Sequence, residues 1–190
     1  MTTWFAALPA LALASIACAT PVAPTPEADR IVASATAKME PRSDSQVSGT
    51  VTFTERLTTV GGKPAFRLDV RYDISGLAPG ETRGFHVHDV GDCSAPDASS
   101  AGGHFNPGGH EHGAMDHPMS HAGDLGNITA DASGRAQGLV TDLTKITLQP
   151  GAAIGILGRS VIVHAKVDDL TTQPTGNAGA RVACGVITAD

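Results

Sequence analysis

The chain has 190 residues, with 13 basic and 19 acidic side chains and a formal net charge of -6. That length suits one globular domain with an appendage better than two full domains. One Trp, one Tyr and five Phe stand beside 22 Gly and 12 Pro, which excludes a coiled coil and argues against a helical bundle. An acidic chain without basic blocks is not expected to bind nucleic acid.

The N-terminus carries an uncharged stretch over residues 4–19. It is too short to span a bilayer and is placed where a secretory leader lies, so we predict a signal peptide over residues 1–19 and a protein of the periplasm or cell envelope. Two processing routes stay open for Cys18. Cleavage at an Ala-x-Ala site (residues 17–19) would remove it, whereas a lipoprotein-type site would leave it acylated as a membrane anchor.

Residues 20–45 are rich in Pro, Ala and Thr and show no sustained hydrophobic period. This composition predicts a flexible tether. The domain itself is therefore expected to cover residues 46–190.

The body of the chain shows short segments of β pattern. Apolar side chains alternate with charged ones over residues 66–74, which is typical of a strand with one face in water. Further strands are predicted over residues 47–55, 84–88, 136–141, 160–165 and 181–187, separated by turns that contain Gly, Asp or Pro. Short strands at this spacing indicate an all-β sandwich or barrel. Two irregular segments, residues 91–124 and 168–180, interrupt them, and long segments of this kind are usually functional or disordered.

Metal-binding side chains are concentrated in and around the first irregular segment. His86 and His88 lie two apart in a predicted strand, so both point to the same face. Five histidines follow in a glycine-rich stretch that ends at Asp124: His104, His110, His112, His117 and His121. His164 interrupts an apolar strand, where it is either a core histidine or a further ligand. The pattern predicts a metal site, with a solvated polar loop as the alternative.

Five separated motifs resemble copper/zinc superoxide dismutase: residues 84–88 (GFHVH), 103–107 (GHFNP), 121–127 (HAGDLGN), 158–164 (GRSVIVH) and 176–186 (GNAGARVACGV). The resemblance covers residues 47–187 and is closest in kind to the bacterial periplasmic enzymes. It implies a Greek-key, immunoglobulin-like β-sandwich or barrel of about eight antiparallel strands with long metal-binding loops. It also implies one copper and one zinc per chain, with superoxide anion as the substrate.

The resemblance assigns roles residue by residue. It implies copper ligands His86, His88, His104 and His164, and zinc ligands His104, His112, His121 and Asp124. His104 would bridge the two metals and carry a proton during catalysis. These donor sets agree with metal chemistry, because imidazoles suit copper and three imidazoles with a carboxylate suit tetrahedral zinc.

Four further roles follow from the same resemblance. Asp168 would link a copper ligand to a zinc ligand, and Arg181 would hold the substrate anion beside the copper. Thr175 would line the access channel, and a disulfide would join Cys93 to Cys184. Because residues 168–180 contain no lysine, we expect Lys166 or a cation from another loop to attract the anion.

Other interpretations stay in view. A non-catalytic copper-binding or copper-delivery protein of the same fold is the second candidate, and a structural zinc protein is the third. His110, His117, Met115 and Met119 exceed the implied ligand sets, and they form either a metal-capturing flap or an ordinary surface loop. The sequence decides neither this question nor whether the domain is a monomer or a homodimer.

Overall fold

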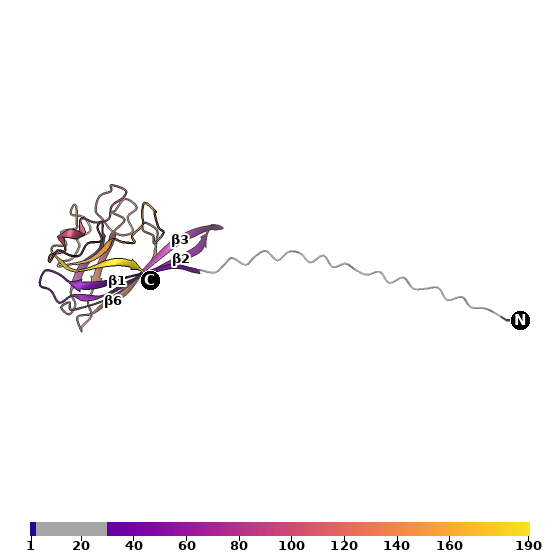
Figure 1. The fold of residues 1–190 in the computed structure, drawn as a ribbon, viewed down its shortest axis with the longest axis horizontal. Helices are drawn as coiled ribbons and strands as arrows, with labels where there is room; N and C mark the ends of the chain where they lie inside the picture. The colour runs from indigo at the N-terminus through magenta and orange to yellow at the C-terminus, as the bar shows by residue number, and fades with distance from the viewer. Residues whose placement is uncertain (3–29) are drawn as a thin grey trace.

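The computed structural model describes residues 1–2 and 30–190, which form eight strands and one short 3-10 turn (Figure 1). The strands are β1 (Arg30–Pro41), β2 (Ser48–Val60), β3 (Lys63–Ser75), β4 (Thr82–His88), β5 (Asp124–Thr129), β6 (Ala136–Leu143), β7 (Ser160–His164) and β8 (Arg181–Ala189). They pair antiparallel in the order β5-β4-β7-β8-β1-β2-β3-β6, a sheet that curls into a nearly closed Greek-key barrel. The predicted all-β fold is confirmed.

The period-two pattern of β3 produces the expected two-sided strand. Leu68, Val70 and Ile74 have no exposed surface and belong to the main core, whereas the intervening Arg71 is exposed. Phe66 departs from the pattern and is 44% exposed. It lies on the hairpin of β2 and β3, which projects beyond the rest of the barrel in Figure 1, so no second layer covers this end of the strand.

The prediction of a flexible tether over residues 20–45 is wrong from residue 30 onward, because β1 is a full member of the sheet. It pairs with β2 and with β8, and Ala37 lies opposite both Val51 and Ile187. Ala35, Ala37 and Met39 are buried. Small Ala and Thr side chains have a weak strand signal of their own, and pairing with two neighbouring strands overrides it. Residues 20–29 lie outside the described part of the chain, as do residues 3–19 with Cys18.

β5 is the second strand that the sequence pattern does not predict, because it lies at the end of the histidine-rich segment. It pairs with β4 and brings Asp124 opposite His86. Within residues 1–2 and 30–190, no helix is long and apolar enough to cross a membrane.

Candidate metal centre

Strand alternation places the histidines of β4 and β7 on one face. His86 lies opposite Ile162 and His88 lies opposite Ser160, so both histidines share a face with His164. The alternate residues of the same strands point the other way, into the main core: Phe85, Val87, Val161 and Val163. The barrel therefore turns its histidines outward, and the segment after β4 covers them. His104 reaches this face because it forms an isolated β-bridge with His88.

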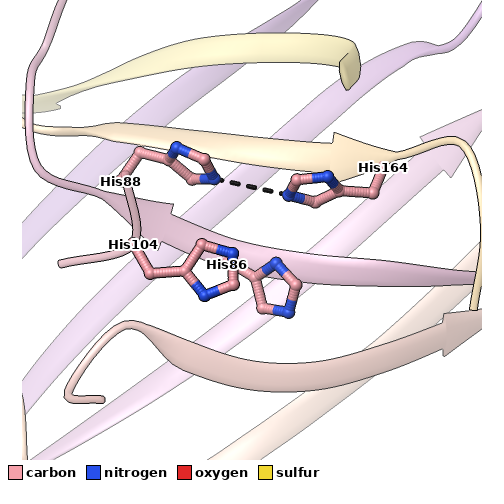
Figure 2. A group of neighbouring side chains, drawn as sticks. All are labelled: His86, His88, His104 and His164. Atoms are coloured by element: carbon pink, nitrogen blue, oxygen red, sulfur yellow. Dashed lines mark hydrogen bonds between the residues drawn. The ribbon is translucent and has the colours of Figure 1, made fainter. Parts of the chain in front are cut away.

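Four imidazole rings converge in this covered region (Figure 2). The ring centroids of His86 and His104 are 4.0 Å apart, and those of His86 and His164 are 4.8 Å apart. Nε2 of His88 lies 3.3 Å from Nε2 of His164. One nitrogen from each of the four rings lies within 4.8 Å of the others, and all four residues are buried. We call this set, His86, His88, His104 and His164, the four-histidine group.

The hydrogen bonds around these rings determine which nitrogen faces the centre. Nδ1 of His88 lies 3.0 Å from the carbonyl oxygen of Gly102, and Nδ1 of His164 lies 3.3 Å from that of Gly179, so Nε2 of each ring is left for the centre. Nε2 of His86 lies beside Asp168, which leaves its Nδ1. In the described part of the chain, His86 Nδ1 and His104 Nε2 are buried without a hydrogen-bond partner. Such unpaired polar atoms are costly unless a ligand satisfies them.

A second group surrounds the carboxylate of Asp124. Its Oδ1 lies 2.8 Å from Nδ1 of His104, 3.1 Å from Nδ1 of His112 and 3.2 Å from Nδ1 of His121. Its Oδ2 accepts hydrogen bonds from the backbone N–H groups of Gly113 and His121, both at 3.1 Å. All four side chains are buried. Three imidazoles and one carboxylate are donors that tetrahedral zinc prefers. We call this set the Asp124 group.

His104 belongs to both groups and faces each of them through a different nitrogen. Nδ1 points to Asp124, and the unpartnered Nε2 points to the rings of the four-histidine group. The structure therefore brings together every residue that the sequence predicts as a ligand, and it places the predicted bridging residue between the two sets.

Asp168 connects the two groups a second time. Its Oδ2 lies 2.8 Å from Nε2 of His86, and its Oδ1 lies 2.8 Å from Nε2 of His112. Sequence reasoning did not identify Asn127, whose side-chain amide bonds both the backbone N–H of Asp168, at 2.8 Å, and its C=O, at 3.0 Å. Gly176 adopts a φ of +64°, and a Cβ there would come within 1.7 Å of Asp168 Oδ1. Asn127 thus fixes the backbone of Asp168, and the missing side chain of Gly176 leaves room for the carboxylate.

The electrostatics differ between the two groups. Burial lowers the pKa of His86 to about 4 and that of His164 to about 3, so both rings are neutral and able to bind a metal. Burial also opposes protonation of His112, but hydrogen bonds to Asp124 and Asp168 outweigh it and raise the pKa of His112 to about 9. Burial likewise opposes ionisation of Asp124, but the bonds from His104 and His112 hold its pKa well below its usual range.

Arg181 begins β8 beside the four-histidine group, opposite His164. Its guanidinium donates hydrogen bonds of 2.6 Å to the carbonyl oxygens of Ala98 and Gly102. The carbonyl oxygen of Gly102 therefore contacts both Arg181 and His88. Because any residue has such a carbonyl group, the sequence does not identify this role. Thr175 is half-buried and lies next to Gly176 in the segment after β7.

A disulfide joins Cys93 to Cys184 across a sequence separation of 91 residues. Cys184 is buried with Ala98, Ala101 and Ile162 in a small cluster under the segment that follows β4. This bridge ties the segment whose carbonyl groups hold Arg181 to the strand that contains Arg181. The anion-binding candidate and its support are therefore linked covalently.

The four extra side chains of the histidine-rich segment do not form one cluster. His110, His117 and Met119 line one surface cavity, together with Glu111 and His112. Met115 lines a different cavity, together with His117, on the side of the loop that faces residues 141–146.

Comparison with known proteins supports the arrangement of these residues. A family model described as copper/zinc superoxide dismutase matches residues 47–187. The chain is 44% identical over 152 residues to a Cu-Zn superoxide dismutase of Neurospora crassa, and 43% identical over 152 residues to Cu-Zn superoxide dismutase 1 of Debaryomyces hansenii. It is also 43% identical over 153 residues to the Cu-Zn superoxide dismutase of Yarrowia lipolytica. Each match covers 77% of this chain and 92% of the relative.

These comparisons correct one prediction from the sequence. The relatives come from fungi, so the localisation in a periplasm or cell envelope is wrong, and the comparisons do not support the bacterial periplasmic type. That prediction depended on the uncharged stretch over residues 4–19, which lies outside the described residues.

Proposed function

The chain belongs to the copper/zinc superoxide dismutase family, and we propose on that premise that its four-histidine group holds copper and its Asp124 group holds zinc. The protein is an oxidoreductase that converts two superoxide anions and two protons into dioxygen and hydrogen peroxide. The observation that carries the residue assignment is the position of His104, which faces both groups through its two ring nitrogens.

The residues fit the two metals. The proposed copper donors are Nδ1 of His86 and Nε2 of His88, His104 and His164, which are the nitrogens that other hydrogen bonds leave for the centre. A set of imidazoles suits copper. The proposed zinc donors are Nδ1 of His104, His112 and His121 with a carboxylate oxygen of Asp124. When bound, copper would supply the one-electron redox chemistry, and zinc would hold the ring of His104 in place.

The protein's own residues contribute orientation and proton handling. Asp168 fixes the ring planes of His86 and His112 by binding the nitrogen of each that faces away from its metal. In His104, Nδ1 is committed to the Asp124 group, so Nε2 is the atom at which the ring takes up and gives back a proton.

Arg181 is proposed to bind the substrate. Two of its N–H donors are held by the carbonyl groups of Ala98 and Gly102, which fixes the guanidinium beside the four-histidine group. A guanidinium has five N–H donors, so others can point to a small anion. We propose that the anion enters beside this positive charge, although the chain as a whole carries a net charge of -6. Thr175 is proposed to line that entrance.

A superoxide assay on the copper- and zinc-loaded protein tests this proposal, with the substitutions His86→Ala and Arg181→Ala as variants. The wild type should be active, His86→Ala should lose copper and activity, and Arg181→Ala should keep copper but lose most of the rate. A copper carrier would bind copper and show no activity, and a structural zinc protein would refuse copper. Failure of the wild type to bind copper, or absence of activity in the fully metallated wild type, would reject the proposal.

Two predictions made from the sequence await their own measurements. Processing of the leader predicted over residues 1–19, either with loss of Cys18 or by cleavage before an acylated Cys18, is tested by mass spectrometry of the mature N-terminus. Association into a homodimer is tested by light scattering coupled to size-exclusion chromatography.

A further inference from the structure

A surface cavity formed by residues 109–119 of the histidine-rich segment contains metal-binding side chains that belong to neither metal group. Its volume is about 370 Å³, and it is lined by Gly109, His110, Glu111, His112, His117 and Met119. His112 is the one proposed zinc ligand among them. Two imidazoles, a thioether and a carboxylate therefore surround one opening next to the inner site.

His110 is held through its backbone while its ring stays available. The side-chain amide of Asn106 donates a 2.9 Å hydrogen bond to the C=O of His110 and accepts a 3.0 Å bond from its N–H. The ring lies against Gly108, where a Cβ would come within 2.5 Å of Nε2. Among the described residues, no hydrogen bond engages either ring nitrogen, and Nδ1 is the one that does not lie against Gly108.

His117 is held in the same way. Its C=O accepts hydrogen bonds from Lys145 Nζ at 3.2 Å, from Ser120 Oγ at 3.0 Å and from the Ser120 N–H at 3.2 Å. Ser120 is buried, and its single hydroxyl proton is shared between this C=O and that of Ala114. The backbone under His117 is thus fixed, and its exposed ring makes one long contact of 3.3 Å, in which Nδ1 accepts from the Met119 N–H.

Met119 presents its side chain to solvent. It is 55% exposed, which is unusual for a large apolar side chain, and Pro118 separates it from His117. Exposure costs hydrophobic stabilisation that a buried methionine would provide. Met115 lies in the same loop and lines a different cavity together with His117, so comparing the two methionines tells on which side of His117 a ligand binds.

We propose that His110, His117 and Met119 form an outer binding site for Cu(I) at the mouth of this cavity. Thioether sulfur favours Cu(I), and neutral imidazole completes a donor set that holds it. Binding through Nε2 of His117 moves the ring proton to Nδ1 and opens the 3.3 Å contact, a small cost at an exposed residue. The site would take Cu(I) from solvent beside His112, a ligand of the inner zinc site. It is separate from the dismutase activity, which requires none of His110, His117 and Met119.

The test uses the copper- and zinc-loaded enzyme with its copper reduced, so that the inner sites are filled and the sample is diamagnetic. Under anaerobic conditions, Cu(I) is added in competition with a chromophoric Cu(I) chelator. The wild type and Met115→Leu should each bind one further equivalent. The triple variant His110→Gln, His117→Gln, Met119→Leu should bind it at least roughly tenfold more weakly.

Nuclear magnetic resonance of methyl-labelled methionine identifies the ligand. Added Cu(I) should shift the Met119 methyl signal and leave the Met115 signal in place. No further equivalent, equal binding by the triple variant, or an equal shift of Met115 would each overturn the proposal. The triple variant should retain wild-type dismutase activity, which shows that it folds and separates failure of this site from failure of the assigned function.

Discussion

Asp168 lies 2.8 Å from Nε2 of His86, and both side chains are completely buried. The second oxygen of the same carboxylate lies 2.8 Å from His112, so one residue sets the ring planes of a copper-site and a zinc-site histidine. Both the copper site and the zinc site should therefore lose order when this carboxylate is replaced.

Replacing Asp168 by Asn keeps the size of the side chain but removes one acceptor and the charge. We expect zinc affinity to fall by about 10- to 100-fold, the usual effect of losing a residue that orients a metal ligand. Competition with a zinc chelator measures it. Asp169→Asn is the matched control, because Asp169 is exposed and bonds the Thr171 and Thr172 residues of its own turn. Equal zinc affinity in the two variants would show that Asp168 does not orient His112.

Replacing Lys145 by Met tests whether its hydrogen bonds hold the loop that contains the zinc ligands His112 and His121. Lys145 Nζ donates a 2.6 Å hydrogen bond to Ser120 Oγ and a second bond to the C=O of His117, and Ser120 directly precedes His121. Without these bonds the loop should open more often, so zinc should dissociate roughly tenfold faster. Stopped-flow transfer to a chelator measures the rate. Lys63→Met, at the exposed tip of the hairpin between β2 and β3, should leave it unchanged; a rate for Lys145→Met equal to that of the control contradicts the account.

Arg181 should govern how fast the anion arrives. For Arg181→Ala we expect kcat/KM to fall by between about 10-fold and 10³-fold, the range of electrostatic steering effects, with copper content unchanged. The wild-type rate should also decrease as ionic strength rises, and Arg181→Ala should show a weaker decrease. Pulse radiolysis measures both. Arg71→Ala, on an exposed face of β3, is the control. A wild-type rate that increases with salt would show that the entrance does not attract anions.

Removing the disulfide should affect stability and activity together. Cys93→Ser, Cys184→Ser and the double variant should each lose about 2–5 kcal/mol of unfolding free energy, since the bridge closes a long loop. Their metallated forms should also have a lower kcat/KM, because the bridged segment provides the Ala98 and Gly102 carbonyl groups that hold Arg181. Chemical denaturation measures the free energy of unfolding, and kinetics of the metallated forms measures kcat/KM. A double variant much less stable than either single variant would mean that the cysteines act separately.

Zinc binding should release a proton at neutral pH. In the metal-free protein the pKa of His112 is raised to about 9, so its ring is protonated at pH 7, and zinc requires the neutral ring. Because this folded-state pKa lies above the unfolded value, His112 stabilises the metal-free fold below about pH 6.5, and the effect disappears as pH rises through about 9. Calorimetry in two buffers of different ionisation enthalpy measures the released proton. Identical heats in both buffers would contradict the prediction.

The sequence predicts the metal ligands better than the residues that hold those ligands in place. Spacing alone places His86 and His88 on one face, and the family motifs together with the family's spacings within the loop assign all seven proposed ligands, which the structure brings together. β1 is missed because Ala35 and Ala37 have little strand propensity and depend on pairing with β2 and β8. Gly102 and Ala98 act through backbone carbonyl groups, and Lys145 and Asn127 act across long sequence separations. No local pattern predicts such contacts.

Anomalous diffraction at the copper and zinc absorption edges, from crystals of the fully metallated protein, tests the central assignment most directly. The account predicts a copper peak enclosed by His86 Nδ1 and Nε2 of His88, His104 and His164. It predicts a separate zinc peak beside Asp124, with the ring of His104 between the two. Zinc in both positions, or copper bound without His104, would contradict it.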